Sequence, residues 1–165
     1  MTWHSIIHFI LFFRIRSLNW ISTEHLNASI DEFSQEVRDI LYQAINDLLE
    51  MDGKMCPQDK LACLVKSSKN IFEMLKLSND SPASADDFLP CLIYICLKAN
   101  PPRIQSNMNF ITRFCNEDKL RMGEGGYFFA NLVSITHKIA TWCDTFLFAD
   151  GDKIYQLELI NNICD

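Results

Sequence analysis

The chain has 165 residues, a mass of 19.1 kDa and a formal net charge of −6, which is enough length for one domain with a buried core. Apolar residues make up 48% and charged residues 22%, a balance typical of globular rather than disordered proteins. The negative charge argues against a nucleic-acid partner, because binding to a phosphate backbone requires a basic face. It suits a protein partner that offers a basic groove or a buried lysine.

The first predicted element is the apolar stretch SIIHFILFF at 5–13. It is much shorter than the about 20 apolar residues that a membrane-spanning helix needs, so no direct membrane insertion is expected. A signal peptide is not expected either, because no basic residue precedes the stretch and no small-residue cleavage site follows it. Residues 1–13 are therefore an unassigned apolar N-terminus, interpreted as a buried first helix or an atypical start.

Two helices are predicted between residues 30 and 77. From Ile30, apolar residues recur at steps of three and four and predict a helix that ends near Gly53, a residue suited to a C-cap. Pro57 suits a first helical position and predicts a second helix, which apolar spacing extends to about Leu77. The stretch SNDSPAS at 78–84 is a loop by composition. The predicted buried stripes are Phe33, Val37, Ile40, Leu41, Ala44, Ile45, Leu48 and Leu49 in the first helix, and Leu61, Leu64, Val65, Ile71, Phe72 and Leu75 in the second.

Two adjacent carboxylates, Asp86 and Asp87, stand directly before an apolar run at 88–97 that predicts a buried third helix. Pro90 constrains where this helix begins, because a proline deep in a helix loses a hydrogen bond and clashes with the preceding turn. Its ring is tolerated only within about the first turn, which places the predicted N-cap at or near Asp86 or Asp87. One aspartate would suffice as a cap. The second aspartate needs another explanation.

Two further helices are predicted after the third. Asn100 is suited to cap the fourth helix, with Pro101 or Pro102 at its first position. The stretch CNEDKLRMGEGG at 115–126 is a turn region, and helical spacing returns at Tyr127. No stretch shows the alternation of a β-strand, so an all-α domain is predicted. The predicted buried stripe of the fourth helix is Ile104, Met108, Ile111 and Phe114.

Other classes of chemistry find little support in the sequence. The seven cysteines are an odd number without a C-x-x-C pair, which predicts free thiols in a reducing compartment rather than a zinc site or a disulfide framework. No metal and no other cofactor is proposed. GEGG at 123–126 lacks the strand-then-helix context of a nucleotide site and is interpreted as a flexible turn. The four histidines are scattered, so a hydrolase is not supported. The cysteines that lie among apolar residues are Cys63, Cys91, Cys96 and Cys115.

Several segments together resemble a known family. PASADDFLPCLIYICLKANPPRIQSNMNFITRF at 82–114, followed by GEGGYFFANL at 123–132, closely resembles the catalytic domain of the vacuolar-protein-sorting-nine (Vps-nine) family. More narrowly, it is similar to the rabaptin-binding branch that exchanges nucleotide on Rab-five GTPases. The match extends to 50–72 and to RIRSLNW at 14–20, so residues 14–134 are assigned to a Vps-nine-type exchange domain. Residues 135–165 form a divergent C-terminal segment.

The resemblance implies a layered helical bundle and guanine-nucleotide exchange on Rab-five-subfamily GTPases, without covalent chemistry and so not as a conventional enzyme. It also implies that Asp86 is the family's acidic finger and that Pro90 is the proline that follows it. Such a carboxylate pairs with the phosphate-loop lysine of the GTPase and competes electrostatically for the magnesium position. Asp87 is then expected to cap the helix. The residues alone leave open that Asp86 is a solvated carboxylate complementing the helix dipole.

Tyr127 matches a family tyrosine that packs on the switch region of the GTPase, although a core tyrosine at the start of an apolar helix is an alternative. Three residues later, on the same helical face, the family usually carries a threonine and this chain has Ala130. The methyl group remains and the hydroxyl is lost; Asn131 compensates only if it faces the same side. The expected GTPase-binding residues are Asp86, Asp87, Pro90, Tyr127, Ala130 and Asn131.

Three functions are considered. The first is an exchange factor for a Rab-five-subfamily GTPase that acts in the cytoplasm, peripherally at early endosomes, with a rabaptin-type effector as a further partner. The second is an exchange-deficient GTPase-binding module, because of Ala130 and the altered flanks at 1–13 and 135–165. The third is a helical structural protein without a GTPase partner.

Overall fold

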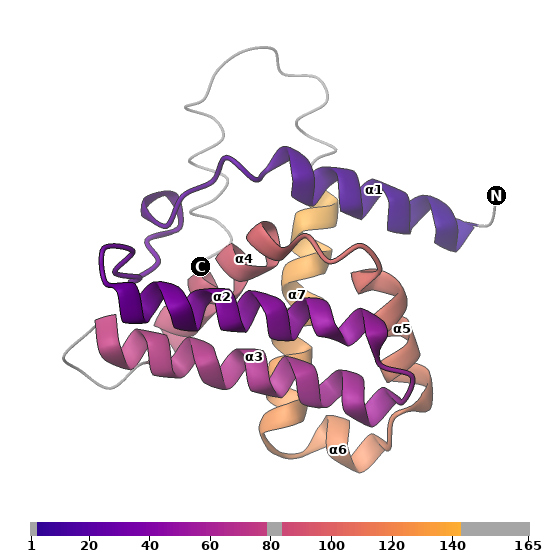
Figure 1. Cartoon of the computed structure of the whole chain (residues 1–165). Coiled ribbons are helices and arrows are strands. Elements are labelled where there is room, and N and C mark those ends of the chain that lie inside the picture. The colour runs from indigo at the N-terminus through magenta and orange to yellow at the C-terminus, as the bar shows by residue number, and fades with distance from the viewer. Residues whose placement is uncertain (1–2, 79–83, 143–165) are drawn as a thin grey trace.

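The computed structural model describes residues 3–78 and 84–142, which form seven α-helices and two short 3₁₀ turns and contain no β-strand (Figure 1). The predicted all-α fold class is confirmed. In chain order the elements are α1 (Trp3–Ser17), η1 (Glu24–Leu26), α2 (Gln35–Glu50), η2 (Met51–Gly53), α3 (Pro57–Ser78), α4 (Ala85–Ala99), α5 (Ile104–Phe114), α6 (Glu117–Arg121) and α7 (Gly123–Trp142).

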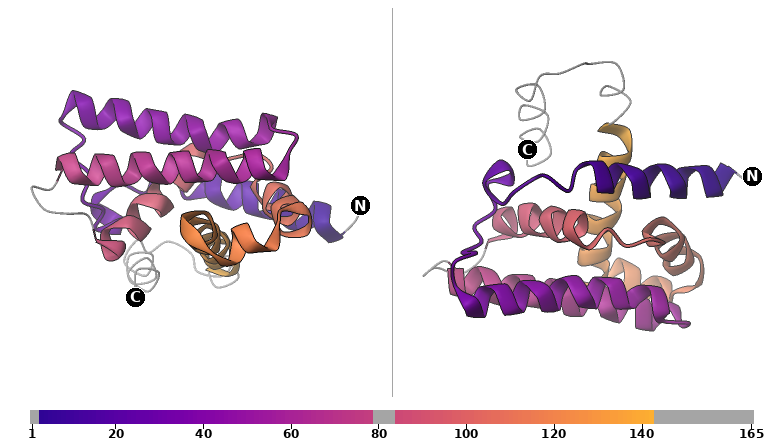
Figure 2. Two further views of the ribbon diagram at one scale, coloured as in Figure 1. Left: turned by 90° about the horizontal axis from the view of Figure 1, so that it is seen from below. Right: turned by 45° about the horizontal axis from the view of Figure 1, so that its top comes forward.

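The helices form layers that are crossed by one long helix. α2 and α3 lie side by side and antiparallel, joined through the η2 turn (Figure 1). α4 and α5 lie against one face of this pair, and α1 lies beyond them (Figure 2). α7 runs across the layers from α6 to α1, where the guanidinium of Arg14 donates a hydrogen bond to the carbonyl oxygen of Ala140. The crossing leaves the first turns of α7 beside α3 and α4.

α4 is the central helix of the fold. Every residue from 91 to 97 is buried, as expected for a helix that is apolar around its whole circumference. Burial raises the pKa of the Cys91 and Cys96 thiols to about 12, so both stay protonated near neutral pH. Cys63 and Cys115 are also free and buried, as predicted, whereas Cys56 is exposed. The remaining two cysteines, Cys143 and Cys164, lie outside the described residues.

The helix α3 has the predicted bounds, but the predicted start of α2 is wrong. α2 begins at Gln35, and the side chain of Phe33, which was expected in the buried stripe, is 94% exposed. The cause is local, because the Asp31 carboxylate accepts a hydrogen bond from the Phe33 N–H at 3.0 Å. Such a side-chain to backbone bond offers the chain an alternative to the helix.

The predicted start of α5 is also wrong. Asn100 does not cap α5 but ends α4, in the left-handed conformation with φ of 40°. The two prolines lie in the linker, and α5 begins after them at Ile104. Phe114 is the last residue of α5 and is exposed rather than buried; its ring packs on Phe110 with the centroids 5.0 Å apart.

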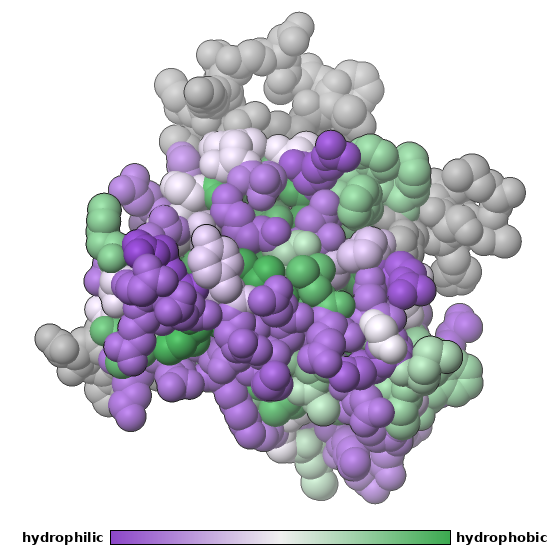
Figure 3. Space-filling model, viewed as in Figure 1, coloured by the Kyte–Doolittle hydropathy of each residue, from purple (hydrophilic) through white to green (hydrophobic). Residues whose placement is uncertain are grey.

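The divergent ends take part in the fold as far as the structure describes them. α1 is one continuous helix across residues 13 and 14; it buries Leu11 and Ile15 and exposes Phe9 and Phe13. α7 continues into the divergent C-terminal segment, where Ile135 and Ile139 are buried among other residues of the core. The face seen in Figure 3 is mostly hydrophilic over α2 and α3. None of the helices in the described residues is long and apolar enough to cross a membrane.

Candidate functional site

The first turn of α4 carries a reciprocal capping box. The N-cap is Ser84, not Asp86 or Asp87 as predicted. The Ser84 hydroxyl oxygen accepts a hydrogen bond from the Asp87 N–H at 3.2 Å, and the Asp87 carboxylate accepts from the Ser84 N–H at 3.1 Å and from the Ser84 hydroxyl at 2.6 Å. The side chain of Asp87 is therefore used within the helix start, but as the third helical residue of a capping box and not as the N-cap that was expected.

Asp86 occupies the second helical position, between the two partners of the capping box. Its side chain is exposed, in contrast to the buried Leu92, Ile93 and Ile95 further along α4. Within the described residues its carboxylate has no hydrogen bond or ion pair. The N-terminal end of the helix favours a negative charge here, and nothing within the described chain neutralises it.

Pro90 lies inside α4, at the sixth helical position, and is buried. This is deeper than the prediction, which allowed the ring only within about the first turn. In a regular helix the N–H of residue 90 would donate to the carbonyl oxygen of Asp86, and proline has no N–H. The ring therefore removes one backbone hydrogen bond from the turn that carries Asp86.

Four aromatic rings join the start of α4 to α3 and α7. Phe88 stacks on Phe72 of α3 with ring centroids 4.9 Å apart and an interplanar angle of 4°. It also lies 5.4 Å from the ring of Phe128 and 6.2 Å from that of Tyr127, both on α7. Two residues correspond to about 200° around a helix, so Phe88 points inward while Asp86 points outward. The cluster holds the exposed carboxylate and the tyrosine at neighbouring helix starts.

Tyr127 is both a packing residue and a surface residue. One part of its ring contacts Phe88 and Phe128, and 45% of the side chain is exposed. Ala130, one turn later, is exposed as well. The side-chain amide of Asn131 donates a hydrogen bond to the Tyr127 carbonyl oxygen at 2.9 Å, so this donor is used within α7. The surface beside Tyr127 thus offers a phenol and a methyl group.

The glycines before Tyr127 form the beginning of α7, whereas a flexible turn was predicted. α7 starts at Gly123, which has φ of 79°. A Cβ atom at Gly126 would overlap the carbonyl oxygen of Leu120, so the close approach of α7 to α6 requires glycine there. This packing places Tyr127 in the first turns of a helix.

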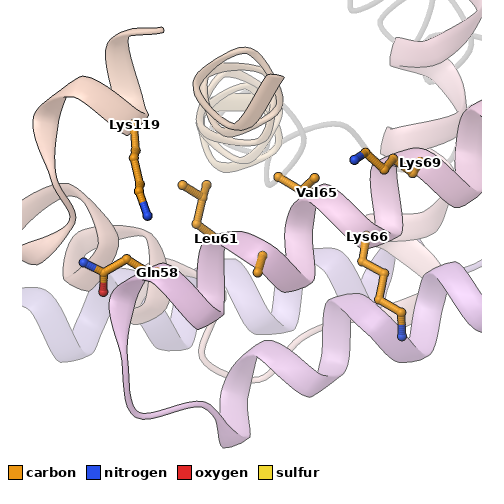
Figure 4. A pocket seen from close by; sticks show the side chains of 7 residues that line it. Gln58, Leu61, Val65, Lys66, Lys69 and Lys119 are labelled. Atoms are coloured by element: carbon orange, nitrogen blue, oxygen red, sulfur yellow. The ribbon is translucent and has the colours of Figure 1, made fainter. Parts of the chain in front are cut away.

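A separate groove of about 400 Å³ lies between α3, α6 and the start of α7 (Figure 4). Its floor is apolar and its rim carries three lysines. Two of these lysines are already paired, Lys66 with the buried Asp47 at 2.7 Å and Lys69 with Glu124 at 2.8 Å. The groove therefore has little net charge to attract a ligand. Its lining residues are Gln58, Leu61, Ala62, Val65, Lys66, Lys69 and Lys119.

Comparison of the sequence with known proteins identifies one domain family. The sequence model of the Vacuolar sorting protein 9 (VPS9) domain matches residues 41–143. The chain is 55% identical over 119 residues to proteins named Rab5 GDP/GTP exchange factor from Bos taurus and Homo sapiens, with 72% of this chain and 24% of each relative covered. It is 34% identical over 96 residues to Receptor-mediated endocytosis protein 6 from Caenorhabditis elegans, with 58% of this chain and 9% of the relative covered. The chain spans about a quarter of the length of the first two relatives.

Proposed function

The chain belongs to the VPS9 domain family, as its motifs predicted, and we propose that it accelerates GDP release from a small GTPase of the Rab5 subfamily. The observation that carries this proposal is the exposed carboxylate of Asp86, which has no hydrogen bond or ion pair within the described residues, at the second position of α4. An unneutralised carboxylate on a helix start can enter a partner's nucleotide site without breaking any contact of its own chain.

Asp86 acts on the GTPase by electrostatic competition. Its carboxylate pairs with the phosphate-loop lysine, which otherwise holds the β-phosphate of GDP, and it disfavours the neighbouring magnesium ion. GDP thereby loses its strongest contacts and leaves. No covalent bond forms or breaks in either protein, so the chain is an exchange factor rather than an enzyme in the covalent sense.

In this proposal, residues at the start of α7 bind the GTPase. The exposed part of Tyr127 and the methyl group of Ala130 offer an apolar contact for the switch region, and the Tyr127 ring lies 6.2 Å from that of Phe88 near the start of α4. Asp87 and the buried Pro90 contribute through the backbone of α4. Asn131 contributes through the Tyr127 carbonyl that it binds.

The cellular setting follows from the relatives. Two are named for Rab5 exchange and one for receptor-mediated endocytosis, which supports action on the cytoplasmic side of early endosomes. In this proposal the protein is peripheral there and has a rabaptin-type effector as a further partner.

Nucleotide release tests the proposal. A panel of Rab GTPases is loaded with a fluorescent GDP analogue, the full chain is added over a range of concentrations with excess unlabelled GTP, and the rate of fluorescence loss is recorded. We expect the rate to rise with chain concentration for Rab5-subfamily members and to stay at its intrinsic value for a GTPase outside the Rab family. An intrinsic rate throughout the panel would refute the proposal.

A second candidate is a GTPase-binding module without exchange activity. The feature that raises it is Ala130, which leaves an exposed methyl group where the family resemblance implies a threonine. Stable binding of the nucleotide-free GTPase, combined with an unchanged rate of GDP release, would select this candidate over the first.

A further inference from the structure

We infer that Ser84 and Asp87 are positioning residues for the Asp86 finger: their reciprocal hydrogen bonds hold the turn from which the Asp86 carboxylate projects. The inference rests on the proposed exchange function and goes beyond it, because it assigns the second carboxylate of the pair and the serine before it. It also explains why two aspartates stand together, one bound within the helix start and one directed outward.

The geometry of the box surrounds Asp86 on both sides. Ser84 and Asp87 exchange three hydrogen bonds, two of them from the backbone N–H groups of Asp87 and Ser84. Ser84, two residues before Asp86, and Asp87, directly after it, are thereby tied to each other. Its side chain is left out of these bonds and stays exposed.

Pro90 makes this turn depend on the box more than an ordinary first turn does. The helical bond from residue 90 to the Asp86 carbonyl oxygen cannot form, and the bond that begins the ladder, from the Phe88 N–H to the Ser84 carbonyl oxygen, measures 3.3 Å. The turn that carries Asp86 therefore has an incomplete backbone ladder. The capping box on one side and the packing of Phe88 among the aromatic rings on the other side hold it in place.

The alternative role for Asp87 is direct contact with the GTPase through its charge. Two substitutions separate the two roles. Ser84→Ala breaks the box and leaves both carboxylates in the chain, whereas Asp87→Asn removes one charge and keeps an acceptor oxygen of the same shape in the box. Positioning predicts damage from Ser84→Ala and little from Asp87→Asn, and direct charge contact predicts the reverse.

The experiment uses the full chain and a Rab5-subfamily GTPase loaded with a fluorescent GDP analogue, and it separates the maximal release rate from the half-saturating chain concentration. We expect Ser84→Ala to lower the maximal rate about fivefold, the factor that corresponds to about 1 kcal/mol for a lost N-cap, with a smaller change in half-saturation. Ser84→Thr should restore the rate, because threonine caps in the same way. Asp87→Asn should lower the maximal rate less than Ser84→Ala does, because the amide oxygen still accepts the hydrogen bond from the Ser84 N–H.

A matched control loses the cap of a helix other than α4. Asn116 caps α6, where its side-chain oxygen accepts from the Asp118 N–H at 2.8 Å, and Asn116→Ala should leave the release rate at the parental value. Circular dichroism and amide hydrogen exchange then show whether Ser84→Ala opens only the first turn of α4. A parental maximal rate for Ser84→Ala, or a larger loss for Asp87→Asn than for Ser84→Ala, overturns the inference. A parent chain that binds no GTPase and releases no GDP overturns the proposed function itself, and with it the inference.

Discussion

Replacement of Asp86 by alanine should remove most of the stimulated GDP release and leave the fold intact. The carboxylate makes no hydrogen bond or ion pair within the described residues and is exposed, so its loss breaks no internal contact that the structure shows. In the complex, a hydrogen bond to a charged partner contributes about 1.5–3 kcal/mol, which corresponds to a fall in release rate of roughly tenfold to over a hundredfold. Asp86→Asn should be nearly as damaging, since the amide keeps the shape and loses the charge that competes for the lysine.

Glu36 provides the matched control, because it is an exposed carboxylate at the second position of α2, as Asp86 is in α4. Glu36→Ala and Asp86→Ala each lose a favourable interaction with a helix dipole, worth about 0.3–1 kcal/mol, and should change urea unfolding equally. Only Asp86→Ala should change fluorescent GDP release. The reasoning fails if Asp86→Ala matches an active parent. If Asp87→Asn is more damaging than Asp86→Asn while helicity is unchanged, the two carboxylates have been assigned the wrong way round.

Three further substitutions test other parts of the structure. Ala130→Thr adds a hydroxyl beside the proposed switch contact, and one new hydrogen bond of about 0.5–1.5 kcal/mol should raise apparent affinity for the nucleotide-free GTPase by roughly two- to twelvefold in titrations. Asp47→Ala removes a buried carboxylate that α3 side chains bind, and urea denaturation should show a loss of about 1.5–3 kcal/mol. Gly126→Ala places a methyl group against the Leu120 carbonyl oxygen and should lower stability by about 1–3 kcal/mol in thermal melts, whereas Gly53→Ala, with open space around it, should cost much less.

The elements that the sequence predicted well are those with strong local signals. α3 begins at Pro57 because proline fits a first helical position, and the apolar run at 88–97 is central because an all-apolar helix has no face to present to water. The capping box also has a local sequence signal, although the N-cap was predicted at Asp86 or Asp87 and not at Ser84. SADD places a serine three residues before a carboxylate, which is close to the S-x-x-E pattern of such boxes.

The parts that sequence did not predict depend on contacts between distant segments. Phe72, Phe88 and Phe128 come from three helices, and no periodicity within one helix indicates that their rings meet. The first turn of α7, which begins at Gly123, likewise depends on a contact with another helix. Gly126 lies so close to the Leu120 carbonyl oxygen of α6 that only glycine fits, so the residue serves packing rather than flexibility. Composition alone describes GEGG at 123–126 as a turn, because residue types do not reveal that Leu120 packs against it.

The placement of Ala130 bears on which of the two proposed functions is the stronger. Ala130 lies on the exposed side of α7, one turn after Tyr127, while the exposed Asp86, the proposed acidic finger, lies in the first turn of α4. In the proposed complex, a hydroxyl at this position would contact the switch region both before and during nucleotide release, so its absence weakens binding equally in both states. Loss of such uniform binding raises the half-saturating concentration and leaves the maximal rate unchanged. A chain that keeps Asp86 exposed and capped should therefore still release GDP once the GTPase is bound, so Ala130 argues for a weaker exchange factor rather than for a binding module without exchange.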